Sequence, residues 1–259
     1  MFTNSKTIIT GNFIEIFKYE KELWYGNLPQ SITRSNGRKR KNGKRTKQSL
    51  QRAKGELKRL INANAWNWFD KNGKVFIPIF LTLTFAENIT DIEKANYEFT
   101  KFIQKFNYKI KYKKSYLKYT TVIEFQKRGA IHYHLVLYNL PFIADLKNKL
   151  EKLWDNGFIF YSKIDKIKNV GVYMSKYMSK NLANKKLYGQ KCYFSSRGLK
   201  KPKVRNDNES ADFLLRFLSE GVDCYQKEYV SDYAGKTIYR NFDLTNQKDL
   251  KKSVLAFIK

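Results

Sequence analysis

The chain has 259 residues, of which 51 are Lys or Arg and 23 are Asp or Glu, so its formal net charge is +28. Aromatic residues make up 16% of the chain, which excludes a disordered basic tail, and its two cysteines lie too far apart for a secreted disulfide scaffold. Strong positive charge with abundant Tyr and Phe favours a nucleic acid as partner, and no apolar run is long enough for a membrane partner.

The positive charge is concentrated near the N-terminus. Between Arg34 and Arg59 there are twelve Lys or Arg residues and one acid, Glu56. The first half of this stretch has no apolar residue and predicts a mobile basic loop. Apolar residues at helical spacing then predict a helix over about 48–69 with one basic face. We therefore assign residues 1–70 to a basic arm and helix.

This basic region allows two interpretations: a grip on DNA phosphates, which we favour, or a solvated charged face. The residues expected to contact DNA are Arg38, Lys39, Arg40, Lys41, Lys44 and Arg45 in the arm, together with Arg128 and Arg197 further along.

The same stretch contains a pattern that resembles a phosphate-binding loop. Five residues separate Gly37 from Gly43, where the loop motif requires four, and Arg45 follows Lys44 where Ser or Thr is required. We therefore expect no nucleotide cofactor and no ATP-driven motor.

The remaining elements alternate between strands and helices. In chain order we predict a strand over 75–85, a helix over 88–106, strands over 119–126 and 130–138, a helix over 142–154, a strand over 157–162 and a helix over 170–182. Loop and strand follow, then a helix over 211–219 and strands over 222–242 that turn at Ala234 and Gly235. This order predicts an α+β fold with a central antiparallel β-sheet flanked by helices. We expect a domain over 70–205, with 206–259 as C-terminal flanking structure packed on it.

The two histidines of the chain lie in one predicted strand. His132 and His134 are two residues apart and share a face of the sheet. If residues 127–129 form a three-residue turn with Gly129 in the left-handed position, Glu124 lies opposite His132 and Val122 opposite His134. A two-residue turn would instead place Glu124 on the other face.

Two imidazoles and a carboxylate that converge on one patch suit a divalent cation. We expect Glu124, His132 and His134 to bind Mg²⁺ or Mn²⁺. The alternative is a pair of half-exposed strand histidines beside a surface glutamate.

The predicted helix over 170–182 contains the duplicated sequence YMSKYMSK. Tyr173 and Tyr177 are four residues apart and stack on one helix face, and Lys176 and Lys180 repeat with the same spacing. A tyrosine hydroxyl can attack a phosphodiester, and a lysine can offset the phosphate charge. The alternative is an amphipathic helix whose Tyr and Met side chains fill a core.

Three segments in this order resemble the motifs of the HUH endonucleases, the rolling-circle replication initiators of small plasmids and phages. They are FLTLTF over 80–85, RGAIHYHLVLY over 128–138 and YMSKYMSK over 173–180. The double tyrosine is similar to the tandem-tyrosine initiators. The resemblance covers about residues 50–205 and implies an HUH fold with an RRM-like core.

The resemblance also implies a reaction: metal-dependent nicking of one strand of origin DNA, with a 5′-phosphotyrosine intermediate and a free 3′-OH. A host polymerase would extend that end, a host helicase would unwind the duplex, and a second transfer would rejoin the strand. Glu124 would be the third metal ligand, and Tyr173 and Tyr177 could serve the two transfers. The expected location is the cytoplasm of a bacterial host cell.

Other functions remain open at the sequence level. A transposase or conjugative relaxase would share the chemistry and differ in biological role. A non-catalytic module could bind single strands through charge and stacking aromatics, although it would not require an HxH motif opposite a glutamate. A ribonuclease is a weaker alternative, because no second acid–base pair is evident.

Overall fold

The computed structural model describes residues 1–26, 47–111, 115–180 and 191–257. Within these residues the chain forms ten strands and six helices, an α+β fold with two antiparallel sheets that is consistent with an HUH endonuclease with an RRM-like core. The contacts divide the chain into two compact units. Unit 1 combines Met1–Asn42 with Lys201–Lys259, and unit 2 is Gly43–Lys200. None of the described helices is both long and apolar enough to cross a bilayer.

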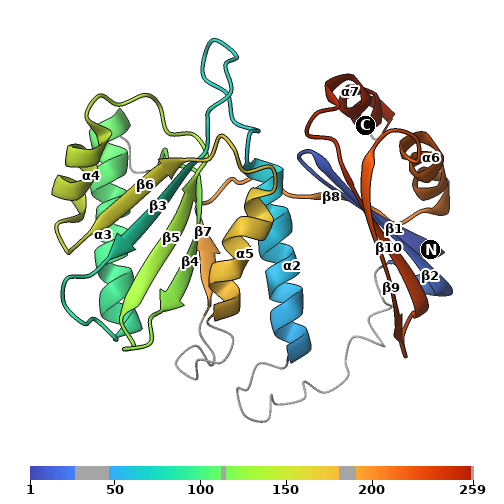
Figure 1. Ribbon diagram of the computed structural model, residues 1–259, viewed down its shortest axis with the longest axis horizontal. Coiled ribbons are helices and arrows are strands. Elements are labelled where there is room, and N and C mark those ends of the chain that lie inside the picture. The colour runs from blue at the N-terminus through green and yellow to red at the C-terminus, as the bar shows by residue number, and fades with distance from the viewer. Residues whose placement is uncertain (27–46, 112–114, 181–190, 258–259) are drawn as a thin grey trace. The chain divides into compact units, whose positions relative to one another are not determined.

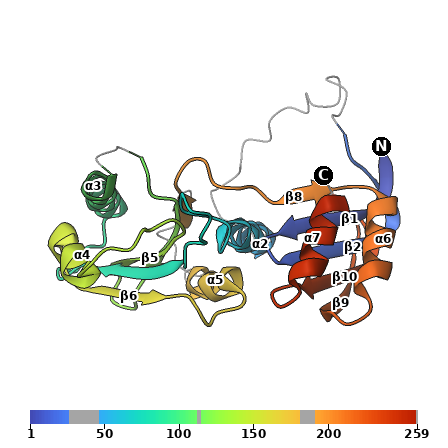
Figure 2. The ribbon, with the colours of Figure 1, turned by 90° about the horizontal axis from the view of Figure 1, so that it is seen from above.

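Unit 2 is built on a five-stranded antiparallel sheet with the order β6-β3-β5-β4-β7 (Figure 1). The strands are β3 (Ile79–Thr84), β4 (Tyr119–Phe125), β5 (Ile131–Leu137), β6 (Ile159–Lys163) and β7 (Tyr193–Ser195). The helices are α2 (Lys47–Asn64), α3 (Ile92–Lys111), α4 (Leu146–Trp154) and α5 (Val170–Lys180). Helices α3 and α5 lie on opposite faces of the sheet (Figure 2). Strand β5 is therefore covered on both sides, and all seven of its residues are buried.

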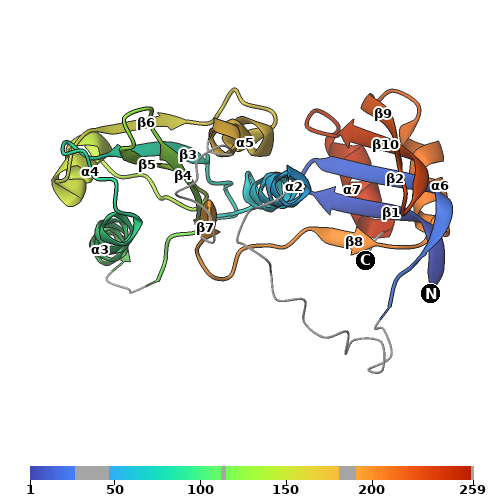
Figure 3. The same cartoon turned by 90° about the horizontal axis from the view of Figure 1, so that it is seen from below.

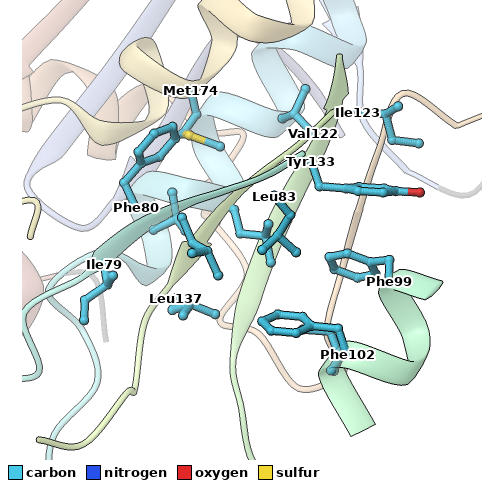
Figure 4. Close-up of a cluster of buried hydrophobic side chains, with 14 of the residues drawn as sticks. Ile79, Phe80, Leu83, Phe99, Phe102, Val122, Ile123, Tyr133, Leu137 and Met174 are labelled. Carbon is cyan, nitrogen blue, oxygen red and sulfur yellow. The ribbon is translucent and has the colours of Figure 1, made fainter. Parts of the chain in front are cut away.

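The main core lies between the sheet and α3. Tyr133 of β5 packs on Phe99 with ring centroids 4.7 Å apart, and Phe102 packs on Trp154 of α4 at 5.7 Å. Figure 4 shows Phe99, Phe102 and Tyr133 on one side of the sheet, and Phe80 with Met174 of α5 on the other. The predicted apolar face of α3 is confirmed, since Ala95, Phe99, Phe102 and Ile103 are all buried.

The β4–β5 hairpin has the predicted register. Gly129 adopts φ 88°, and the Gln126 N–H donates to the Ala130 carbonyl at 2.9 Å, which closes a three-residue turn. Glu124 consequently pairs with His132, and Val122 pairs with His134. The odd number of turn residues thus sets which face of β4 carries the carboxylate.

Helix α5 is fixed to α2 through two asparagines. Asn169 caps α5, because its Oδ1 accepts from the Val172 N–H at 3.0 Å. Asn62 of α2 donates its amide to Asn169 Oδ1 at 3.0 Å and accepts from the Gly171 N–H at 2.8 Å. These bonds hold the start of α5, and with it the position of the tyrosines one and two turns later.

Unit 1 is a second antiparallel sheet with the order β8-β1-β2-β10-β9 (Figure 3). The strands are β1 (Phe2–Thr10), β2 (Phe13–Trp24), β8 (Lys203–Arg205), β9 (Asp223–Ser231) and β10 (Gly235–Asp243), and the helices are α6 (Asn208–Leu218) and α7 (Lys248–Phe257). Its core joins Ile14 and Ile16 of β2 with Leu214 of α6, Phe242 of β10 and Val254 of α7.

Unit 1 differs from the sequence-based expectation. Residues 2–24 are strands and not part of a basic arm, and β10 pairs with β2. The C-terminal stretch 206–259 thus completes a sheet with the N-terminus, where we expected flanking structure. The helix predicted over 48–69 belongs to unit 2. The basic loop over 34–46 lies outside the described residues.

Several element ends in unit 2 also differ from the prediction. Helix α2 ends at Asn64, because Trp66 has φ 63° and turns the chain. The predicted strand over 75–85 is regular only at Ile79–Thr84, and the helix predicted from residue 142 begins at Leu146. The positions on which the site depends are unaffected by these shifts.

The close approach of α5 to α2 gives a stability prediction. A Cβ at position 171 would meet the Lys58 carbonyl oxygen of α2 and lie 2.7 Å from Asn62 Oδ1. We expect Gly171→Ala to lower the free energy of unfolding by about 1–3 kcal/mol, because the helices must separate to admit the methyl group. Urea unfolding followed by circular dichroism measures this change.

Gly55→Ala is the matched control. A Cβ there would meet only Arg59 at 3.7 Å, so the helical propensity of alanine should leave stability unchanged or raise it by up to about 1 kcal/mol. Equal stability of Gly171→Ala and the native chain would contradict the close contact.

Candidate metal centre and tyrosine pair

Glu124 of β4 and His132 and His134 of β5 lie on one face of the unit 2 sheet. Their ligand atoms all lie within 4.8 Å of one another, and all three residues are buried. The exposed fractions are 9% for Glu124, 9% for His132 and 5% for His134. The structure thus brings together the three residues that the hairpin register predicted, and this group could hold a metal ion.

Hydrogen bonds fix the orientation of His134 at both ring nitrogens. Its Nε2 lies 2.5 Å from Glu124 Oε2, and its Nδ1 lies 3.0 Å from the Thr82 hydroxyl of β3. His132 has a weaker second contact, with Nδ1 3.5 Å from Gln126 Nε2. Metal-binding histidines are commonly oriented in this way by a partner on the second nitrogen. The donor set of one carboxylate and two imidazoles fits a divalent cation with further positions left for a substrate.

The electrostatics of the cluster favour a neutral His132. Burial lowers the pKa of His132 below its ordinary value, and the charges of His134 and Arg128 act in the same direction, whereas Glu124 opposes them. A neutral imidazole has the free electron pair that metal binding requires. The exposed Arg128, at the hairpin turn, is therefore close enough to act electrostatically on the cluster.

Tyr177 of α5 packs directly on the cluster. Its ring stacks on the ring of His134, with centroids 3.9 Å apart and an interplanar angle of 26°. The hydroxyl of Tyr177 lies 3.1 Å from that of Tyr173. Phe80 of β3 packs against all three rings, with centroids 5.5–5.9 Å away. The two tyrosines and the predicted ligands therefore share one site.

The structure separates the two interpretations of the YMSKYMSK helix. Met174 and Met178 are fully buried and fill the core. Tyr173 and Tyr177 are only partly buried and lie on the side of α5 that meets His134 and Phe80. Methionines and tyrosines thus serve different surfaces of one helix.

The environment keeps the Tyr177 hydroxyl protonated. Burial raises the pKa of Tyr177 above its ordinary value, and the hydrogen bond with Tyr173 and the nearby charge of Glu124 raise it further. A nucleophilic Tyr177 must therefore pass its proton to another group, and the Tyr173 oxygen is within hydrogen-bond distance.

The other expected site residues are less closely engaged. Lys176 of α5 is exposed, and the side chain of Lys180 lies outside the described part of the chain. Arg197 is exposed, and its carbonyl accepts from Lys118 Nζ at 2.8 Å. The arm residues Arg38, Lys39, Arg40, Lys41, Lys44 and Arg45 also lie outside the described residues, so their contact with DNA remains a prediction.

Two residues of β3 belong to the site although the sequence analysis gave them no role in it. Thr82 pairs with His134 in the sheet and bonds its ring, and Phe80 forms the floor beneath the tyrosines. The strand alternation that places Phe80, Thr82 and Thr84 on one face was the available signal. It could not show that β3 lies beside β5, because no short turn joins them.

The contact between Thr82 and His134 predicts an effect on metal affinity. We expect His134→Ala to abolish Mn²⁺ binding measured by isothermal titration calorimetry, since a ligand is lost. Thr82→Val should weaken Mn²⁺ binding roughly 10- to 100-fold, the usual effect of removing a group that orients a ligand.

Thr84→Val provides the control on the same strand and face. The Thr84 hydroxyl bonds the Phe158 backbone, so its loss should leave Mn²⁺ affinity unchanged. An equal effect of the two threonine substitutions would show that the Thr82 hydrogen bond does not orient a ligand.

Comparison with known proteins agrees with this arrangement. Residues 78–182 match the family model of the replication-associated proteins of the ORF2 type. The matched region runs from β3 through α5 and includes Glu124, both histidines and both tyrosines. No curated protein and no solved structure gives a significant match to the chain. The chain therefore carries a domain of this replication-associated protein family, which is consistent with a rolling-circle replication initiator.

Proposed function

We propose that this protein is a site-specific endonuclease that nicks one strand of origin DNA and becomes joined to its 5′ end through a tyrosine. The observation that carries the proposal is the stacking of Tyr177 on His134, which belongs to the Glu124–His132–His134 cluster. A replication-associated family and a net charge of +28 support DNA as the substrate.

The proposed reaction begins at the Tyr177 hydroxyl. Its oxygen attacks the phosphorus of a phosphodiester, and the new O–P bond replaces the bond from phosphorus to the 3′ oxygen. The phenol proton moves to the Tyr173 oxygen, 3.1 Å away, and the departing 3′ oxygen takes up a proton to become a free 3′-OH. The products are a 5′-phosphotyrosine and a 3′ end that a host polymerase could extend.

The cluster would serve the phosphate. A divalent cation such as Mg²⁺ or Mn²⁺, held by Glu124, His132 and His134, would supply positive charge to offset the phosphate oxygens. Thr82 and Glu124 hold the His134 ring, and Lys176 on the exposed side of α5 would add a second positive charge.

The tyrosine pair fits a two-transfer scheme. Tyr177 contacts His134, whereas Tyr173 contacts Phe80 and Tyr177, so we assign the first attack to Tyr177. The Tyr173 hydroxyl would then be the second nucleophile that rejoins the displaced strand after replication. A host helicase would unwind the duplex, and these steps would take place in the cytoplasm of a bacterial host.

A gel assay for covalent adducts tests the proposal. End-labelled single strands from the replicon are incubated with Mn²⁺ or with EDTA and resolved under denaturing conditions. We expect an adduct with Mn²⁺ alone. Tyr177→Phe should abolish it because the nucleophile is gone, while Tyr173→Phe should slow it and block rejoining.

Tyr97→Phe is the control, since Tyr97 is an exposed tyrosine of α3 on the opposite side of the sheet. It should form the adduct at the native rate. Tight DNA binding without an adduct on any strand would refute the nuclease and leave a binding module.

A further inference from the structure

Two exposed phenylalanines lie at the edge of the unit 2 sheet on the site's own face. Phe158 is 80% exposed and Phe160 is 60% exposed. Phe160 belongs to β6, the edge strand that pairs with β3, and Phe158 lies just before it. Large apolar side chains gathered on an exposed surface commonly mark a binding site.

The strand register aligns both rings with the candidate metal cluster. Phe160 pairs with Thr82, and Thr82 pairs with His134. The backbone of Phe158 bonds Thr84, which pairs with His132. Since paired residues share a face, two rows cross the sheet from a phenylalanine through a threonine to a histidine.

A ring contact supports this orientation. Phe80 packs edge-on against Phe160 with centroids 6.4 Å apart, and Phe80 also stacks beside His134 and Tyr177. Two strand spacings separate β6 from β5, which is about 10 Å. A nucleotide next to a phosphate at the cluster could therefore reach the phenylalanines across the small threonine side chains.

The backbone holds Phe158 in its exposed position. The Thr84 hydroxyl donates to the Phe158 carbonyl at 3.0 Å and accepts from its N–H at 3.1 Å. Gly157 has φ 154°, and a Cβ there would collide with the Thr84 carbonyl oxygen. Trp154 donates its indole N–H to that same carbonyl at 2.7 Å. The ring is thus presented by fixed backbone and does not depend on burial of its own.

We propose that Phe158 and Phe160 stack on unpaired bases of the DNA strand whose phosphate lies at the cluster. This inference rests on the proposed function and names the part of the substrate that the sheet edge binds. Aromatic rings stack on the flat faces of bases, and only a single strand leaves those faces uncovered. The two phenylalanines would hold the strand so that one phosphate is presented to Tyr177.

Binding to bases can be separated from binding to phosphates. We would measure the affinity of the full chain in EDTA for a fluorescent oligo(dT) 20-mer and for a 20-mer of abasic residues with the same phosphates. The double substitution Phe158→Ala with Phe160→Ala should weaken oligo(dT) binding roughly 5- to 100-fold and leave abasic binding unchanged. Replacement of both residues by Trp should restore the affinity.

Phe142→Ala is the matched control. Phe142 is 96% exposed but lines a pocket with Phe106 and Lys109 of α3, on the other side of the sheet. It should bind both oligomers as the native chain does. Native oligo(dT) affinity in the double variant, or equal weakening on both oligomers, would overturn the proposal.

A kinetic arm ties the rings to the reaction. In the adduct assay the double variant should show a raised KM with kcat largely retained, because stacking holds the strand and takes no part in bond making. A loss of kcat with unchanged KM would overturn the stacking role. Because the affinity measurement is made without nicking, failure of the nuclease and failure of the stacking proposal give different results.

Discussion

The site depends on one local constraint, the odd length of the turn between β4 and β5. Three residues separate Gln126 from Ala130, and Gly129 adopts the left-handed conformation that closes such a turn. A change of one residue would move Glu124 to the other face of the sheet, away from both histidines. The carboxylate would then enter the core beside α3, where a charged group is costly to bury. The metal cluster and the core therefore depend on the same turn.

Around this turn, the two faces of β5 carry different tasks. Tyr133 anchors the core against Phe99, while His132 and His134 point to the opposite face. A site built on a central, fully buried strand is held rigidly, and α5 is fixed to α2 by Asn62 and Asn169 before it presents its tyrosines. The chain thus holds nucleophile and ligands in place before DNA arrives, which lowers the entropy lost on reaching the reactive geometry.

The sequence was most informative where the structure is local. The hairpin register, the apolar face of α3 and the pairing of Glu124 with His132 were predicted correctly, because turn length and strand alternation determine them. The role of Phe80 and Thr82 required knowing that β3 lies beside β5, across a helix of intervening sequence. The strands over 2–24 were missed for a related reason. Strand β2 pairs with β10 more than 200 residues later, and its many Lys and Glu residues hide its pattern.

The central claim is that Tyr177 attacks DNA beside the Glu124–His132–His134 cluster. Peptide mapping by mass spectrometry of the protein–DNA adduct tests it most directly, after nuclease digestion has trimmed the DNA to a few nucleotides. The account predicts a 5′-linked nucleotide on Tyr177 of the native chain, and none on any peptide of His134→Ala. A nucleotide on a residue outside α5, or one that persists in His134→Ala, would contradict it.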